Sequence, residues 1–187
     1  MKKLIFLLEE PSAKEMLKEI LPRLLPFHIH TDFKVFEGKQ DLEKRLPIIL
    51  RGWQIPNCSF VVLRDQDSGN CHDVKEKLID LCQQAEDKEI LVRVACHELE
   101  SFYLGDLVAV EKGLGLNRIA RMQNKKKYRD PDRLTNPSKE LERLSSGHYQ
   151  KILGSRAIAP YLDFEGNKSE SFRALLSGIL KLVNSQA

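Results

Sequence analysis

The sequence has few cysteines and no long hydrophobic run, and both absences narrow the class of protein. The four cysteines are dispersed and form no CxxC pair, so neither a paired zinc motif nor a disulfide framework is predicted. The doublets Cys71-His72 and Cys96-His97 leave zinc open as an alternative. No stretch approaches the roughly 18 apolar residues of a membrane span, and no cleavage site follows the short apolar run near the start. We therefore expect a cytoplasmic protein with no membrane partner.

A glycine-rich phosphate-binding loop is also missing, so the chain itself is not expected to hydrolyse nucleotides. Aromatic residues make up only 7% of the sequence, but apolar residues make up 42%, which is enough for a folded core. The 187 residues suit one domain with a small appended lobe. The net charge of +3 permits a nucleic-acid partner without indicating one, because recognition depends on where cations cluster.

Four short apolar segments alternate with helical patterns along the first hundred residues. The helices between them have apolar faces, and the first is expected to open with a capping box at Ser12 and Glu15. This βαβαβαβ order predicts an α/β fold with a mostly parallel four-stranded sheet flanked by helices. The strands are predicted at 3–8, 28–37, 59–63 and 90–95.

The pattern changes beyond Glu100, and we expect a small helical C-terminal lobe. We divide the chain into a core at 1–110 and a segment at 111–187 that packs on the core as part of one structural unit. The segment begins with a polar, basic loop at 117–137. Helices follow from Asn136-Pro137 onward and at about 155–162 and 169–184.

Acidic side chains follow three of the predicted strands. Because the carboxyl ends of parallel strands meet at one edge of a sheet, these acids are expected to converge on one crevice. Residues two apart on an extended segment face the same way, but in a helix they diverge. Helix capping and turn formation are the alternative for each carboxylate. The five acids are Glu9 after the first strand, Asp65 and Asp67 after the third, and Glu98 and Glu100 after the fourth.

Such a constellation suits a divalent metal. Mg²⁺ and Mn²⁺ prefer oxygen ligands, and two such ions can activate a water and stabilise the leaving oxygen in phosphodiester cleavage. The five acids are therefore candidate catalytic residues. If Glu98 begins a helix, only one of Glu98 and Glu100 is expected to reach the site.

Several motifs resemble known families. Leu7-Leu8-Glu9-Glu10-Pro11-Ser12 resembles the opening motif of Toprim-like domains, and Leu63-Arg64-Asp65-Gln66-Asp67 resembles their DxD strand end. Three further motifs resemble domain-of-unknown-function family 4276, and together this resemblance spans most of residues 3–165. They are Gly38-Lys39 before a leucine-rich helix, Val92-Arg93-Val94-Ala95 leading into Glu98-Leu99-Glu100-Ser101-Phe102, and Asn136-Pro137-Ser138-Lys139-Glu140.

The resemblance implies a Toprim-like fold and an Mg²⁺-dependent nuclease, often near an ATPase partner in bacterial defence-type systems. It also implies that Glu9 is the general acid/base and, with Asp65 and Asp67, forms the core metal site. Glu98 and Glu100 match the ELE motif of the family. One position departs from the Toprim pattern, which has glycine after its glutamate where this chain has Glu10, and that side chain crowds the approach of a phosphate.

A basic run surrounds Tyr128 within residues 118–133. Its cations can neutralise phosphates while the tyrosine stacks on a base, which would give salt-sensitive binding without sequence preference. A solvated loop is the alternative. Two further cations precede an apolar turn at 157–159 and are candidates to lie near a scissile phosphate. The candidate nucleic-acid-binding residues are Lys125, Lys126, Lys127, Arg129, Lys151 and Arg156.

Two functions stay open on the sequence. The first is an Mg²⁺- or Mn²⁺-dependent nuclease or phosphodiesterase acting on nucleic acid. The second is a non-catalytic Toprim-like module that binds nucleic acid or a partner protein such as an ATPase, and Glu10 in place of glycine favours it. The choice between DNA and RNA, the cutting mode and the oligomeric state are not predicted.

Overall fold

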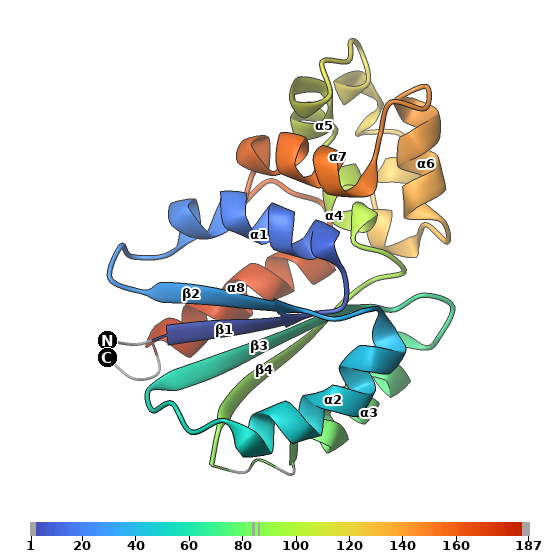
Figure 1. The fold of residues 1–187 in the computed structure, drawn as a ribbon. Helices are drawn as coiled ribbons and strands as arrows, with labels where there is room; N and C mark the ends of the chain where they lie inside the picture. Colours follow the sequence, from blue (N-terminus) through green and yellow to red (C-terminus); the bar gives the residue numbers. More distant parts are fainter. Residues whose placement is uncertain (1–2, 84, 86, 185–187) are drawn as a thin grey trace.

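A sheet of four parallel strands organises the first half of the chain (Figure 1). The computed structural model describes residues 3–83, 85 and 87–184. The strands lie in the order β2-β1-β3-β4, and β1 pairs with both β2 and β3 along its whole length. Because all four run the same way, their carboxyl ends share one edge. The strands are β1 (Lys3–Leu8), β2 (His30–Val35), β3 (Cys58–Asp65) and β4 (Glu89–Ala95).

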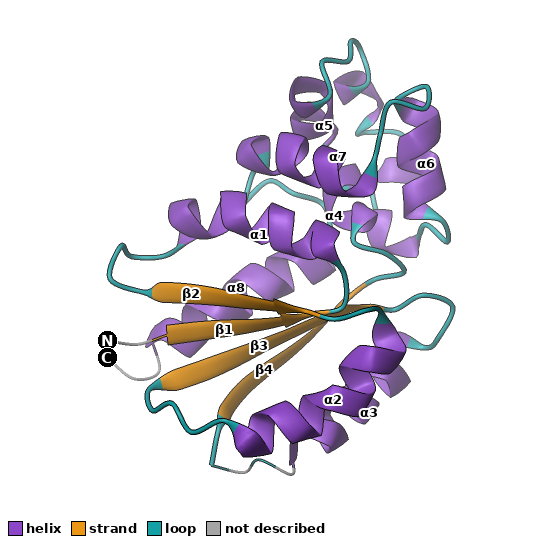
Figure 2. Cartoon of the chain, in the orientation of Figure 1, coloured by secondary structure: helices purple, strands orange, loops and turns teal. Residues whose placement is uncertain are grey.

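Helices cover both faces of this sheet (Figure 2). Helices α2 (Lys39–Gly52) and α3 (Cys71–Gln83) cover one face, and α1 (Pro11–Leu24) and α8 (Glu170–Asn184) cover the other. Alternate strand residues feed two separate cores, as in β1, where Ile5 and Leu7 point to α2 while Leu4, Phe6 and Leu8 point to α1. Burial on both faces explains why the strands read as continuous apolar runs.

A helical lobe lies on the outer side of α1, away from the sheet, and its helix α7 packs along α1 (Figure 1). Short 3-10 turns at 120–122, 126–128 and 131–133 occupy the stretch that the sequence predicts as a polar loop. In the part of the chain that the structure describes, no helix has the length and apolar character needed to cross a bilayer. The lobe contains α4 (Glu100–Leu104), α5 (Leu107–Gly113), α6 (Pro137–Leu144) and α7 (Lys151–Ile158), followed by a 3-10 turn at 159–161.

The last helix lies apart from the rest of the predicted C-terminal lobe. It packs along β4, where Phe172, Leu175 and Ile179 fill the core on the α1 side of the sheet. The guanidinium of Arg93 in β4 also donates to the carbonyl of Ala174 at 3.0 Å. The division of the chain at residue 110 stays a prediction, and α8 belongs to the layer that covers the sheet.

The ends of the elements differ from the predicted ends in a few places. Strand β2 is shorter than the expected 28–37, and α7 begins before the expected 155. The predicted capping box at the start of α1 is wrong, because the helix already begins at Pro11, a residue suited to the first helical position. The Ser12 hydroxyl donates to Glu10 at 3.0 Å, and Glu15 pairs with Lys18 instead.

Candidate functional site

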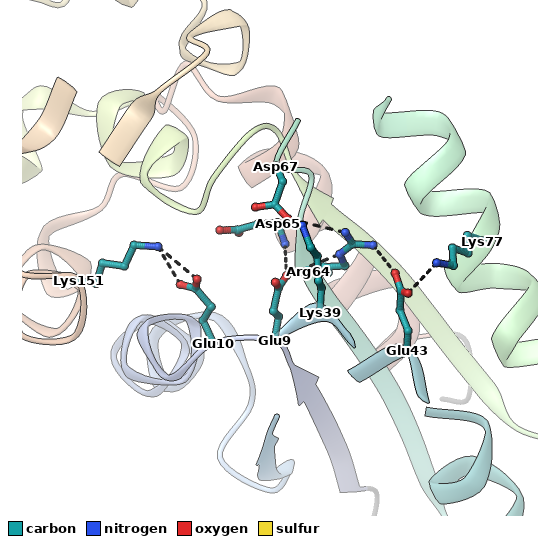
Figure 3. Close-up of polar contacts among 9 residues, drawn as sticks. All are labelled: Glu9, Glu10, Lys39, Glu43, Arg64, Asp65, Asp67, Lys77 and Lys151. Atoms are coloured by element: carbon teal, nitrogen blue, oxygen red, sulfur yellow. Dashed lines mark hydrogen bonds and ion pairs between the residues drawn. The ribbon is translucent and has the colours of Figure 1, made fainter. Parts of the chain in front are cut away.

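The carboxyl ends of β1 and β3 bring Glu9 and Asp65 together (Figure 3). Leu8 and Leu63 are paired in the sheet, so the residues that follow them leave neighbouring strands at the same edge. The backbone N–H of Asp65 donates to Glu9 Oε2 at 3.0 Å, and both side chains are buried. Two acids that are 56 residues apart in sequence thus share one buried site, as the sequence predicts.

Glu100 adds a third buried carboxylate from the first residue of α4. The Tyr149 hydroxyl donates to its Oε1 at 2.8 Å. Its Oε2 is buried and has no hydrogen-bond partner among the residues that the structure describes. An unpaired buried oxygen costs free energy. A cation or a further donor at this position would therefore stabilise the site.

Burial and mutual repulsion raise the pKa of these acids. Burial has the largest effect on Asp65, and the nearby charges of Glu10, Glu100 and Glu9 add to it, so the pKa of Asp65 lies well above its ordinary value. Burial also raises the pKa of Glu9 and of Glu100. Clustered carboxylates in a buried site resist ionisation unless a cation compensates them. The electrostatics favour a positively charged ligand.

Asp67 does not follow Asp65 into this cluster. Its backbone is left-handed, with φ 57°, so the alternation of the strand ends before it. Its N–H donates to the carbonyl of His97 at 2.7 Å, which ties the two strand-end loops together. Its carboxylate lies 2.8 Å from Lys39 Nζ and 3.8 Å from Arg64 (Figure 3). The assignment of Asp67 as a metal ligand stays a prediction.

Arg64 is a buried cation of the site that the sequence analysis did not select. Its Nε lies 3.7 Å from Glu9, and its Nη1 lies 2.7 Å from Glu43, which also pairs with Lys77 at 2.6 Å (Figure 3). The signal was present in the sequence, because an arginine inside an apolar strand next to an acid needs a carboxylate partner when it is buried. Arg64 holds Glu9 and Glu43 in place from the α2 side.

Glu98 caps a helix of the lobe. The backbone N–H of Ser138 donates to Glu98 Oε2 at 2.8 Å, at the start of α6, where Asn136 makes no side-chain cap. The helix α4 begins at Glu100, so Glu98 lies before the helix and the expectation for a helix that begins at Glu98 does not apply. Glu100 alone of this pair lies with the buried acids, and a catalytic part for Glu98 stays a prediction.

Glu10 and Lys151 form an ion pair at the rim of the acids. Lys151 Nζ lies 3.2 Å from each carboxylate oxygen of Glu10 (Figure 3). One turn further along α7, Arg156 pairs with Glu15 of α1 through Nε at 2.7 Å. Both cations were predicted to bind nucleic acid, and in the structure both join α7 to the chain around α1.

The basic loop divides into structural and exposed cations. Tyr128 is only 1% exposed and its hydroxyl donates to Glu140, so the expected stacking of this ring on a base is wrong. Lys127 pairs with the same carboxylate at 2.6 Å. Lys125 and Lys126 are exposed, and Arg129, also exposed, donates to the carbonyl of Asn124 at 2.8 Å. Their binding to nucleic acid stays a prediction.

The donor set suits a hard divalent cation, although the donors do not form a closed cage. Glu9, Glu10 and Asp65 line a cavity of about 10 Å³, close to the smallest volume that holds one water. The unpaired oxygen of Glu100 adds a donor of the type that Mg²⁺ prefers. Among the described residues, however, no three acidic, histidine or cysteine side chains are already spaced to hold a metal. The chemistry fits Mg²⁺ or Mn²⁺, and binding requires the side chains to turn.

Comparison with known proteins bears on the fold. The family model described as "Domain of unknown function (DUF4276)" matches residues 8–180. A solved structure, the C-terminal region of the Burkholderia pseudomallei OLD protein, is similar with a TM-score of 0.52 and 17% identity over 98% of this chain and 97% of that chain. No curated protein matches the sequence. At this identity the structural likeness shows the fold alone, and it confirms the predicted Toprim-like α/β class.

Proposed function

We propose that this chain, which belongs to the DUF4276 family, is a divalent-metal-dependent phosphodiesterase that acts on nucleic acid. The observation that carries the proposal is the gathering of Glu9, Asp65 and Glu100, three buried acids with raised pKa, at the carboxyl edge of the sheet. Strained clusters of titratable groups of this kind are typical of functional sites. The Toprim-like fold supports the same reading.

The residues divide into roles that the geometry supports. Asp65 and Glu100 would hold Mg²⁺ or Mn²⁺. When bound, such an ion would polarise a phosphate oxygen and lower the pKa of a coordinated water. Glu9 keeps its position through Asp65 N–H and Arg64, and its raised pKa suits proton transfer closer to neutral pH than an ordinary glutamate allows. Lys151 is placed to bind a phosphate at the rim of the acids.

The exposed cations of the lobe extend this site for a polymer. Lys125, Lys126 and Arg129 are exposed at or beside the 3-10 turn at 126–128. Cations of this kind neutralise backbone phosphates without reading sequence. We include them in the proposal as a contact surface for the nucleic-acid strand away from the acids.

A second candidate is a non-catalytic module that binds a protein such as an ATPase. Two ion pairs favour it, because Asp67 is neutralised by Lys39 and Glu10 by Lys151. A metal at this edge has to compete with these internal cations. A module without catalysis would keep both pairs in its working state.

The test is cleavage by purified protein of single-stranded DNA, plasmid DNA and RNA in Mg²⁺, in Mn²⁺ and in chelator. Wild type is expected to cut at least one of them only with metal, and Glu9→Gln and Asp65→Asn to lose that activity. Asp73→Asn is the matched control, because Asp73 is an exposed acid on the first turn of α3. Cutting in chelator, or full activity in Asp65→Asn, would contradict the proposal.

A further inference from the structure

We propose that Lys151, paired with Glu10 at the rim of the acid cluster, is an internal cation that competes with a divalent metal for the cluster. The inference rests on the proposed function for the identity of the ligand. It concerns the chain's own residues, however, and metal binding tests it without any measurement of cleavage. Glu10 is the carboxylate that holds the lysine in this position.

The contact joins parts of the chain that are far apart. Glu10 precedes α1 at the end of β1, whereas Lys151 is the first residue of α7, 141 residues later. The ammonium lies 3.2 Å from both oxygens of Glu10, and Figure 3 shows it directed toward the group that contains Glu9 and Asp65. The Ser12 hydroxyl holds Glu10 from the other side at 3.0 Å. The carboxylate is thus fixed between two donors.

Two hollows meet at this ion pair. The inner cavity of about 10 Å³ is lined by Glu9, Glu10 and Asp65. An outer hollow of about 460 Å³ is lined by Glu9, Glu10 and Lys151, with Phe36 and Ile152 among its apolar walls. Glu9 and Glu10 line both hollows and Lys151 lines only the outer one, so the ion pair lies where the two hollows adjoin. A metal ion that enters from the outer hollow meets this pair first.

The lysine and a metal would seek the same carboxylates. Partial burial acts to lower the pKa of Lys151, but the charge of Glu100, the charge and hydrogen bond of Glu10 and the charge of Asp65 together raise it. The buried Oε2 of Glu100 has no hydrogen-bond partner among the described residues, so the lysine does not complete the site. Two cations at one acid cluster repel each other strongly where water is scarce. Metal binding therefore weakens the attraction between Lys151 and the acids. This attraction in turn lowers the affinity for the metal by the same factor.

The charge of the acid cluster is therefore partly neutralised by Lys151 before a metal binds. Glu10 lines both hollows and holds the ammonium in the outer one, whereas Lys151 does not line the inner cavity. Metal entry would release Lys151 toward the outer hollow.

The experiment is calorimetric titration of Mn²⁺ into metal-free wild type, Lys151→Met and Arg156→Met. Arg156→Met is the matched control, since it removes a cation and an ion pair between α7 and α1 without touching the acid cluster. Lys151→Met is expected to bind Mn²⁺ about tenfold more tightly than wild type, a change of about 1.4 kcal/mol. Arg156→Met is expected to bind like wild type.

Equal or weaker Mn²⁺ binding by Lys151→Met would overturn the inference and leave the proposed function standing, provided that wild type binds. Absence of Mn²⁺ binding in all three proteins would overturn both. Thermal denaturation separates a structural lysine from a competing one. Competition predicts that Mn²⁺ raises the melting temperature of Lys151→Met more than that of wild type, whereas equal rises in the two proteins would count against it.

Discussion

Single carboxylates near the sheet edge differ in the charges that surround them. Hydrogen bonds from Arg156 and Lys18 lower the pKa of Glu15, so its charge stabilises the folded chain. Burial and the charges of neighbouring acids raise the pKa of Asp65, and the charge of Lys151 opposes this only in part. Glu15 therefore holds α7 against α1. The raised pKa of Asp65 is instead typical of a binding site, where stability is given up for function.

Replacing Asp65 by asparagine is expected to stabilise the metal-free protein while it removes metal uptake. The amide keeps the size of the side chain and removes a buried charge that Glu9, Glu10 and Glu100 repel. Because the folded-state pKa is the higher one, the charge of Asp65 destabilises the fold above its ordinary pKa, and we expect a higher free energy of unfolding at pH 7.5 in chelator. Urea denaturation measures it, and Asp73→Asn should change little. A loss of stability would show that the charge of Asp65 is compensated in the folded protein.

Glu140 is expected to give the stability a defined dependence on acid pH. Burial opposes its ionisation, but hydrogen bonds from Arg143, Lys127 and Tyr128 outweigh burial and lower its pKa from 4.5 to about 2. Because the folded pKa is the lower one, the stabilisation is complete above pH 4.5 and is lost as the pH falls toward 2. Glu140→Gln should cost about 2 kcal/mol at pH 7 and almost nothing near pH 2.

Denaturation of wild type and Glu140→Gln across this pH range measures the effect. Glu142→Gln is the control, since Glu142 is an exposed acid on the same helix. A destabilisation by Glu140→Gln that stays constant from pH 7 to pH 2 would rule out the charge as its cause.

Among the helices, α6 depends on an acid from outside its own sequence. Glu98 receives the N–H of Ser138, so Glu98→Ala should cost about 1 kcal/mol, as the loss of an N-cap does. Glu98→Gln keeps an oxygen that can accept this bond and should cost less. If metal-dependent cleavage is lost in Glu98→Gln while stability is kept, Glu98 is catalytic as well. Retained cleavage would limit it to capping.

The crossing of α5 and α7 depends on a glycine. A Cβ atom at Gly113 would come within 2.5 Å of the Ala157 carbonyl and 2.6 Å of Ile158 Cα, and both are backbone atoms of α7 that cannot turn away. Gly113→Ala should therefore destabilise the protein by about 1–3 kcal/mol, despite the better helix propensity of alanine. Thermal denaturation checks this. Gly52→Ala at the end of α2 meets no atom within 4 Å and should not lower stability.

Across the whole molecule, the sheet was predictable and the lobe only in part. Apolar periodicity found the four strands, because parallel strands buried on both faces leave a clear local signal. The same edge argument correctly joined Glu9 with Asp65. This argument does not predict the left-handed backbone of Asp67 or the ion pair of Arg64 with Glu43. The backbone of Asp67 is bonded to His97 in the loop after β4, and Arg64 pairs with Glu43 of α2. Sequence spacing does not record such contacts between distant elements.

The exposed cations of the lobe predict that binding to nucleic acid depends on salt. Replacing Lys125, Lys126 and Arg129 together by glutamine should weaken binding to single-stranded DNA and reduce the slope of log affinity against log salt by about 2. Replacing Lys127 would also disturb Glu140, so it stays unchanged. Fluorescence anisotropy at several salt concentrations measures the slope. An unchanged slope would exclude these turns from the contact surface.

The position of α8 has a consequence for biosynthesis. The ribosome completes all four strands before residues 170–184 exist, so the face of β4 that Phe172, Leu175 and Ile179 later cover stays bare while the lobe is translated. During that interval the nascent chain presents an uncovered apolar sheet face, which is a site for chaperone binding or for self-association. Stalling of translation between residues 162 and 170 should therefore produce an aggregation-prone intermediate, and release of α8 should end that vulnerability.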